Sequence, residues 1–440
     1  MFHPGKPISA AALVDAIERA VAEGALRTDE RLPPVRALAA ATGLAPNTVA
    51  AAYRTLSQRG LAVGRGRAGT FIAVRPSATV LRDSSPPAGL IDLSSGSPDP
   101  ALLPALDNAL ANIEPTPVLY GADPLDPALA PWARRWAIPA GLDSARVAVV
   151  GGALDGVERV LNAHTRAGGR VIVEDPGYAA VFDLLAALGL VAVPVPLDQE
   201  GMRPDALEQA LARGPIDAVV VTPRAHNPTG AAWSADRQAQ LREVLDQHPK
   251  LLLIEDDHAG PVAGAPPRSL VSPDRTRWAV VSSVSKSLGP DLRLAFLAAD
   301  PHTLNRVETR QQLGTGWVSH LLQRLVAALL ADPATETCLA HAAEQYRQRR
   351  QHLTNRLAQA AIPASAASGL NVWVPVAAEA PVLAALAQRG WWARPGQRFR
   401  LATPPAIRLC VAALTPGQLD QLGEDLIEVL SRVEPGRRVG

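Results

Sequence analysis

The hydrophobic positions in the first 75 residues repeat at the spacing of short helices. Apolar residues three or four positions apart predict a helix before Gly24, a second after Leu32-Pro33-Pro34 and a third around Tyr53. Two short apolar runs on either side of a glycine-rich turn at 64–69 then predict a hairpin. Three helices followed by such a hairpin are typical of a winged helix-turn-helix, and a plain three-helix bundle is the alternative. The winged form is favoured because the turn is basic and has no packing purpose.

The pattern beyond residue 90 consists of short runs that are apolar at every position and that alternate with helical stretches. Such runs are typical of mostly parallel strands buried on both faces of a sheet, whose ligands bind at the carboxyl ends of the strands. They occur at residues 147–150, 171–173, 218–221, 251–254 and 279–281. The sequence therefore predicts an α/β domain.

A smaller α+β lobe is predicted at the end of the chain. A helical pattern runs from Pro333 through Ala360, strand-like runs follow at 370–374 and 408–412, and a last helix begins after Pro416. The residues just before the α/β domain have the Pro, Ser and Gly content of a linker. The predicted divisions are a winged helix-turn-helix at 1–75, a linker at 76–90, a large α/β domain at 91–335 and a small lobe at 336–440.

Length and composition agree with several folded domains. A chain of 440 residues with 48% apolar and 19% charged residues is expected to be globular rather than disordered. No apolar run approaches the ~20 residues of a membrane span, and the first residues lack the apolar core of a secretion signal. We therefore expect a cytoplasmic protein without a membrane partner. Cys338 and Cys410 have no metal-ligand spacing, so no metal site is expected.

Basic residues are concentrated in the head, which we define as residues 1–75. The head contains ten Lys and Arg against five Asp and Glu, which predicts a DNA partner, with a solvated basic surface as the alternative. The candidate DNA-binding residues are Arg36, Asn47, Thr48, Arg54, Arg65 and Arg67. Arg65 and Arg67, in the wing, are expected to contact phosphates, and Arg36 and Arg54 are the better candidates for base contacts.

Lysine is rare in this chain. Only three of the 43 basic residues are lysines, namely Lys6, Lys250 and Lys286. Lys286 follows an apolar, serine-rich stretch at 282–285, where an amine must serve a purpose that arginine cannot. Lys286 is therefore the candidate for covalent chemistry.

Two further polar clusters, at residues 225–230 and 255–258, also follow predicted strands. Asn227 and Asp256 are 29 residues apart, and Asp256 and Lys286 are 30 residues apart. Each interval is the length of one strand-helix-strand unit, so all three residues are expected at one edge of the sheet.

An amide, a carboxylate and a lysine at one edge match the needs of pyridoxal phosphate. The aldehyde of this cofactor forms an imine with a lysine amine, its ring nitrogen requires a carboxylate, and its ring oxygen requires a hydrogen-bond donor. Lys286, Asp256 and Asn227 fill these roles in that order.

The phosphate of such a cofactor needs an anion site of its own. The turn at 151–154 follows a predicted strand and opens a helix, so its backbone N–H groups and the helix dipole would meet an anion there. Three residues close to Lys286 in the sequence could complete this site. The predicted phosphate-binding residues are Gly152, Ala153, Leu154, Ser283, Ser285 and Arg293.

These motifs resemble two known families. Residues 32–73 are similar to the winged helix-turn-helix of the GntR superfamily, and residues from about 92 to 430 resemble fold-type I aminotransferases. The motifs that carry the second resemblance are Glu174-Asp175-Pro176-Gly177-Tyr178, Asn227-Pro228-Thr229-Gly230, Glu255-Asp256-Asp257 and Ser285-Lys286-Ser287-Leu288-Gly289-Pro290 with Arg293. A head and body of these kinds joined by a linker are the layout of MocR-type regulators.

The resemblance implies roles for four more residues. Tyr178 would stack on the pyridine ring, and Tyr120 would reach the phosphate of the neighbouring subunit in a homodimer. Arg408 would pair with the carboxylate of an amino-acid ligand, for which a guanidinium fork is suited. His258 stands where the family commonly has a tyrosine that donates to the ring oxygen. The turn at 151–154 also departs from the family, because it lacks the usual hydroxyl and amide side chains.

Three functions fit these features. The first is a transcriptional regulator that senses pyridoxal phosphate, an amino compound as effector, or both, with slow or absent transamination. The second is a working aminotransferase with a vestigial DNA-binding head, and the third is a DNA-binding protein whose body only dimerises. Lys286 and Asp256 argue against the third function because a scaffold needs neither. The basic head favours the first over the second.

Overall fold

The computed structural model describes residues 9–27, 30–58, 61–64, 69–72, 86–137 and 146–433. The chain divides into two compact units, one with residues 1–82, 165–171 and 182–192 and the other with the remaining residues. Among the described residues, no helix is both long and apolar enough to cross a membrane.

The head contains the predicted three helices and hairpin. These elements are α1 (Ala10–Ala22), α2 (Val35–Thr42), α3 (Pro46–Gln58) and the antiparallel strands β1 (Ala62–Gly64) and β2 (Thr70–Ile72). The side chain of Ser9 caps α1, and Gly43 ends α2 in the left-handed conformation that glycine adopts easily. Leu13, Leu38 and Leu56 come from the three helices and share one buried core. The winged helix-turn-helix is thereby confirmed.

The large domain is built on an eight-stranded sheet, as expected for the α/β class. Its order is β4-β11-β10-β9-β8-β5-β6-β7, in which β8, β9 and β10 are parallel and β11 is antiparallel to both neighbours. The strands are β4 (Arg146–Val150), β5 (Arg170–Asp175), β6 (Val191–Asp198), β7 (Gly201–Met202), β8 (Ala218–Val221), β9 (Leu252–Asp257), β10 (Trp278–Ser283) and β11 (Ala295–Ala299).

Helices cover both faces of this sheet. A Cβ on Gly156 of α6 would lie 3.0 Å from Val281, whereas Ser282, the next residue of β10, donates to the carbonyl of Trp136 in α5. Because successive strand residues point to opposite faces, α6 and α5 lie on opposite sides of the sheet. The helices of the large domain are α4 (Asp107–Asn112), α5 (Ala130–Ala137), α6 (Ala153–His164), α7 (Ala179–Ala187), α8 (Pro204–Ala212), α9 (Ala235–Asp246), α10 (Pro301–Gln312) and α11 (His320–Ala331).

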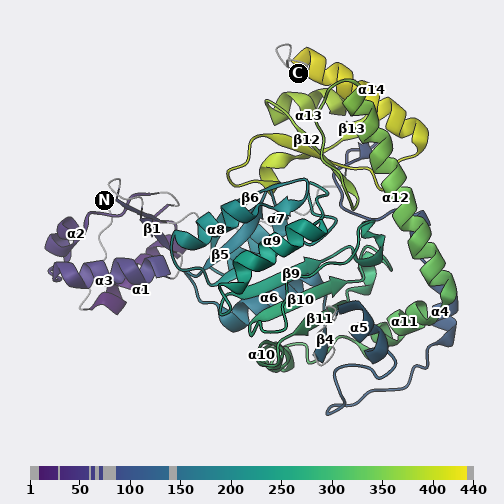
Figure 1. The fold of residues 1–440 in the computed structure, drawn as a ribbon. Helices are drawn as coiled ribbons and strands as arrows, with labels where there is room; N and C mark the ends of the chain where they lie inside the picture. The colour runs from purple at the N-terminus through teal and green to yellow at the C-terminus, as the bar shows by residue number, and fades with distance from the viewer. Residues whose placement is uncertain are drawn as a thin grey trace. The chain divides into compact units, whose positions relative to one another are not determined.

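The C-terminal lobe has its own sheet and core. It contains α12 (Pro333–Gln359), β12 (Asn371–Pro375), α13 (Glu379–Gln388), β13 (Trp391–Trp392), β14 (Arg394–Pro395), β15 (Ala406–Cys410) and α14 (Pro416–Val433). Figure 1 shows α12 running from α14 in this lobe to α11 in the large domain. The two-residue strand β3 (Ile91–Asp92) pairs with β13, and Leu93 lies in the core of the lobe. The start of the body therefore joins the lobe at the end of the chain.

Candidate functional site

The predicted amide, carboxylate and lysine follow three neighbouring parallel strands. Asn227 lies in the turn after β8, Asp256 is near the end of β9, and Lys286 follows β10. Asp256 is directly opposite Val281 in the register of β9 and β10. Carboxyl ends of parallel strands meet at one edge of a sheet, so the nearly equal sequence intervals correspond to one edge as predicted.

Asp256 is a buried carboxylate with an unused oxygen. The residue is 4% exposed, and its Oδ1 has no hydrogen-bond partner among the described residues. The pKa of Asp256 is raised from 3.8 to about 7, first by burial and then by the charges of Asp257 and Glu174, against the lowering effect of Lys286. A protonated ring nitrogen is the partner that this oxygen lacks, so the residue fits pyridoxal phosphate.

Lys286 is half-buried, and its Nζ donates to the carbonyl oxygen of Gly96 at 2.6 Å. Burial lowers the pKa of Lys286 below its ordinary value of 10.5, and the positive charge of Arg408 acts in the same direction. A lowered pKa leaves more of the amine neutral near pH 7, which is the form that attacks an aldehyde.

Asn227 is held by a turn that is tied to the C-terminal lobe. Its Oδ1 accepts from Asn371 Nδ2 at 3.5 Å and from Arg408 Nη1 at 3.4 Å. Ser368 receives a hydrogen bond at its Oγ from the backbone N–H of Ala225 at 2.8 Å, and its own N–H donates to Gly230 at 2.7 Å. The lobe therefore positions the amide toward the strand ends.

The imidazole of His258 has a lowered pKa, which favours its neutral form near pH 7. The pKa of its half-buried imidazole is lowered from 6.5 to about 4, mainly by burial and then by the positive charge of Lys286. A neutral imidazole has one N–H donor, which is enough for the predicted bond to a ring oxygen.

The predicted phosphate turn presents backbone N–H groups and lies beside the side chain of Arg293. Gly152 has a φ of +115°, and a Cβ at this position would lie 3.0 Å from Arg293 Nη2, which donates to the carbonyl of Gly151 at 3.1 Å. Ala153 opens α6, and the first N–H groups of a helix have no intrahelical acceptor. The N–H of Gly151 is already bonded to Asp155 Oδ2 at 2.7 Å.

The other predicted phosphate residues differ in how they are placed. Leu154 lies in the first turn of α6, where the predicted role falls to its backbone N–H. The hydroxyl of Ser283 accepts the N–H of Ser285 and bonds to the Ser285 hydroxyl, both at 3.1 Å. This local turn carries the chain from β10 to Lys286.

Arg408 is buried beside the lysine and the amide. Its guanidinium contacts the carbonyl of Ser94 and lies over the ring of Phe399, with 5.0 Å between its Cζ and the ring centroid. Arg408 also contacts Asn227, so its guanidinium lies beside the predicted cofactor residues, and its pairing with the carboxylate of an amino-acid ligand stays a prediction.

The two predicted tyrosines are both exposed. Tyr178, at the start of α7, is 38% exposed. Tyr120 is 96% exposed, and its ring lies edge-on to Trp317 with 5.7 Å between centroids. Its predicted role in a neighbouring subunit requires this exposure.

Sequence reasoning missed two buried contacts behind Asp256. Arg224 binds Asp257 through two hydrogen bonds of 3.0 and 2.7 Å, so this carboxylate has a cationic partner. Glu174 Oε2 accepts the N–H of Thr222 at 2.9 Å and lies 3.4 Å from His226 Nε2. Glu174 and His226 stand in motifs already noted, but the sequence carries no signal for which carboxylate is paired.

The DNA-binding candidates of the head are mostly exposed. Arg36 on α2 and Asn47 and Arg54 on α3 are exposed, and Thr48 on α3 is half-buried. Arg65 and Arg67, in the wing, lie outside the described residues. The exposed candidates are thus available to a partner.

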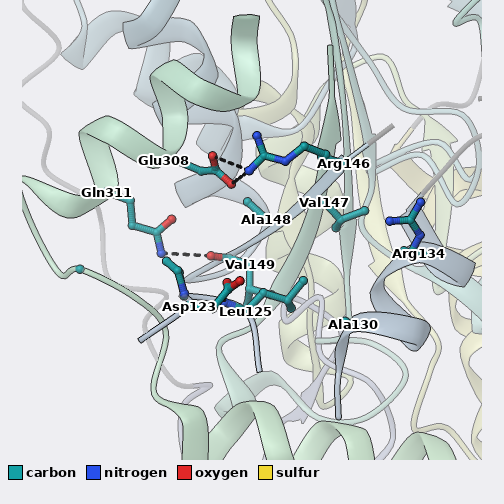
Figure 2. Close-up of a pocket in the computed structure, with 12 residues that line it drawn as sticks. Asp123, Leu125, Ala130, Arg134, Arg146, Val147, Ala148, Val149, Glu308 and Gln311 are labelled. Carbon is teal, nitrogen blue, oxygen red and sulfur yellow. Dashed lines mark hydrogen bonds and ion pairs between the residues drawn. The ribbon is translucent and has the colours of Figure 1, made fainter. Parts of the chain in front are cut away.

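A cavity of about 180 Å³ lies at the open edge of β4 (Figure 2). Arg146 forms an ion pair with Glu308 at 3.0 Å beside it, and Gln311 Nε2 donates to the carbonyl of Val149 at 3.0 Å. The hydrogen bond from Gln311 occupies the carbonyl group of Val149 at the edge of the sheet, where another strand could otherwise pair. None of the predicted cofactor residues lines this cavity.

Comparison with known proteins identifies both parts of the chain. Residues 90–426 match the family described as aminotransferase class I and II. The chain belongs to this family. Residues 9–72 match bacterial regulatory proteins of the gntR family, so the layout is that of MocR-type regulators, as predicted.

Relatives of the whole chain include two named regulators. The chain is 40% identical to the vitamin B6 salvage pathway transcriptional repressor PtsJ of Salmonella typhimurium, over 96% of this chain and 98% of that protein. It is 28% identical to the pyridoxine biosynthesis transcriptional regulator PdxR of Corynebacterium glutamicum, over 81% of this chain and 80% of that protein.

Solved structures confirm the fold class of the body. The α-aminoadipate aminotransferase LysN of Thermus thermophilus aligns with a TM-score of 0.70 and 22% identity, covering 79% of this chain and 93% of that one. The kynurenine aminotransferase of Pyrococcus horikoshii aligns with a TM-score of 0.71 and 19% identity, over 79% and 92% of the two chains.

Proposed function

We propose that this protein is a transcriptional regulator that binds DNA through its head and pyridoxal phosphate through its body. The observation that carries the proposal is the buried Asp256, whose Oδ1 has no partner, near a lysine of lowered pKa in a chain with a gntR-type head. The proposed head is 1–75, the linker 76–90, the large domain 91–335 and the small lobe 336–440. We also place the protein in the cytoplasm, because a DNA-binding regulator needs access to DNA.

The residues of the body have distinct tasks in this function. Pyridoxal phosphate supplies an aldehyde for amines and a ring that withdraws electrons. Lys286 would hold the aldehyde, Asp256 would hold the proton of the ring nitrogen, and Asn227 with His258 would hold the ring oxygen. The N–H groups of Gly152, Ala153 and Leu154, with Arg293, Ser283 and Ser285, would hold the phosphate.

An amino compound is the effector that this site supports. Arg408 is buried and would pair with a carboxylate, and Lys286 would hold the aldehyde group of the cofactor, which reacts with amines. We expect effector binding to change the affinity of the protein for DNA. By thermodynamic linkage, bound DNA then changes the affinity for the effector by the same factor.

The test is an absorbance spectrum of the full chain with pyridoxal phosphate, followed by DNA binding under the same conditions. We expect a visible band that Lys286→Ala removes, and salt-dependent binding to duplex DNA that changes when amino acids shift the band. A spectrum indifferent to Lys286→Ala, or DNA binding indifferent to salt, would contradict the proposal.

A homodimer is the proposed assembly. Exposed apolar side chains gather on α4, on α11, which packs against it, and on the loops beside them. They are Leu106, Leu110, Leu119, Tyr120, Leu313 and Leu321. Apolar surface of this kind is typical of contacts between copies, and Tyr120 would reach the partner's phosphate from it.

Light scattering after size exclusion tests this assembly. Leu110→Glu should convert the dimer to a monomer, whereas Leu401→Glu, at a comparably exposed leucine elsewhere, should leave it unchanged. A Leu110→Glu protein that remains dimeric would assign the apolar face to another partner.

A working aminotransferase is the second candidate, because Asn227, Asp256, Lys286 and Arg408 are all assembled. Rapid turnover is not expected, because the predicted phosphate turn has no hydroxyl or amide side chain at Gly152 to help hold the cofactor. A loosely held cofactor is easily misplaced, and small misplacements of reacting groups lower reaction rates by large factors. Rapid multiple-turnover formation of keto acid, with DNA affinity indifferent to cofactor and amino acids, would favour the enzyme.

A further inference from the structure

Two arginines meet at one oxygen atom beside the predicted effector site. Arg394 of β14 is directly opposite Arg408 of β15 in an antiparallel pair, so their side chains lie on the same face. Arg394 Nε donates to the carbonyl oxygen of Ser94 at 3.0 Å, and Arg408 Nη2 donates to the same oxygen. Arg394 stands in none of the sequence motifs described above.

The loop that carries Ser94 is held in place by the strands around it. The N–H of Leu93 donates to the carbonyl of Trp392 at 2.8 Å, and the N–H of Cys410 donates to the carbonyl of Leu93 at 2.9 Å. The loop therefore runs between the end of β13 and the end of β15. Its position beside both arginines follows from this pairing and not from the arginines alone.

A third cation binds the same loop. Lys286 Nζ donates to the carbonyl of Gly96, two residues after Ser94. Three cationic side chains thus donate to two neighbouring carbonyl groups. The described carboxylate of this loop, Asp92, accepts from the N–H and hydroxyl of Ser94 and from the N–H of Ser95, so its Oδ1 serves the backbone of the loop.

An acid group would be a stronger acceptor here than a carbonyl. Hydrogen bonds between a guanidinium and an anion are roughly twice as strong as bonds between neutral groups. A guanidinium also presents several N–H donors in a planar fork, so two of them can bind one acid group from two sides. The face shared by Arg394 and Arg408 therefore suits an anion that lies near Lys286.

We propose that Arg394 and Arg408 together bind the acid group of the amino-compound effector, so that Arg394 determines specificity for compounds that carry both an amine and a carboxylate. The inference rests on the proposed function, because it names the class of ligand for the same site. Arg394 contacts the acid group and not the reacting amine. Its loss should therefore affect ligands according to their acid group only.

The experiment is a titration of the visible band of the cofactor-loaded full chain with matched compounds. The pairs are L-alanine with ethylamine and L-phenylalanine with phenethylamine, which differ only in the carboxylate. Arg394→Gln should weaken binding of both amino acids roughly 10–100-fold, as expected for a lost bond to a charged group, and leave binding of both amines unchanged. Arg394→Lys, which keeps the charge but not the fork, should give an intermediate loss.

A matched control separates this role from a general effect of removing an arginine. Arg389 lies in the same lobe and pairs with Asp425 and Glu428, so Arg389→Gln should change neither class of ligand. If Arg394 only tethers the loop, Arg394→Gln will weaken amines and amino acids equally or alter cofactor affinity, and the inference is wrong. A wild-type protein whose band responds to no compound would overturn the effector part of the proposed function as well.

Discussion

Replacement of Asp256 by asparagine should stabilise the body of the protein in the absence of cofactor. The carboxylate is buried, one of its oxygens has no partner, and Asp257 and Glu174 repel its charge. Asparagine has nearly the same shape and no charge to desolvate. Asp256 therefore lowers the folding stability of the cofactor-free body, and a bound ring nitrogen would offset this loss.

The size and sign of this effect follow from the pKa. A carboxyl whose pKa rises from 3.8 in the unfolded chain to about 7 in the folded one binds more protons when folded, so stability falls as pH rises between those values. The loss of folding stability is absent below pH 3.8 and complete above about pH 7. At about 1.4 kcal/mol per pH unit the interval corresponds to on the order of 4 kcal/mol. The gain from Asp256→Asn should therefore be about 2 to 3 kcal/mol larger at pH 8 than at pH 5.

Urea unfolding followed by tryptophan fluorescence measures this gain. All eight tryptophans lie between residues 132 and 392, so the signal reports the body and not the head. Asp257→Asn is the matched control: it removes the partner of the buried Arg224 and should destabilise the body by about 3–5 kcal/mol instead. An Asp256→Asn protein that is no more stable than wild type at pH 8, or equally more stable at pH 5 and 8, would refute the reasoning.

Three further predictions concern the phosphate turn, a buried arginine and the head. Gly152→Ala should weaken cofactor binding roughly tenfold or more in a spectrophotometric titration, because Gly152 has a φ of +115° and faces Arg293. The control Gly390→Ala should leave cofactor binding unchanged, because Gly390 has a φ of +92° but open space around it. Arg350→Met should lower the stability of the body to urea by about 1–3 kcal/mol, because its buried guanidinium donates to the carbonyls of residues 366, 367 and 369; unchanged unfolding would contradict this. Arg54→Ala should weaken binding to the preferred DNA site by about 1–3 kcal/mol and reduce discrimination between DNA sequences in an anisotropy titration, and unchanged affinity and discrimination would remove Arg54 from the interface.

The order of the cofactor residues could be predicted from the sequence. Continuous apolar runs mark strands buried on both faces, and nearly equal intervals between polar clusters place those clusters at one edge of a parallel sheet. Asn227, Asp256 and Lys286 follow β8, β9 and β10 for this reason. The helices of the head were equally predictable, because each buries one stripe at helical spacing.

The surroundings of these residues were decided by tertiary contacts. Strands of two residues, such as β3 and β14, are too short to show a period. No local pattern therefore indicates that Arg394 lies opposite Arg408 or that both contact Ser94. The antiparallel strand β11 is likewise an apolar run whose direction no local pattern specifies.

Residue identity alone also could not separate the two neighbouring aspartates of the Glu255-Asp256-Asp257 motif. Adjacent strand residues point to opposite faces, and only the fold determines what each face contacts. Asp257 meets Arg224, whereas Asp256 meets no donor at its Oδ1 among the described residues and has a pKa of about 7. The sequence determined which chemical groups the site contains and in what order. The tertiary structure decided which of their charges are paired, because pairing and burial depend on segments far apart in the chain.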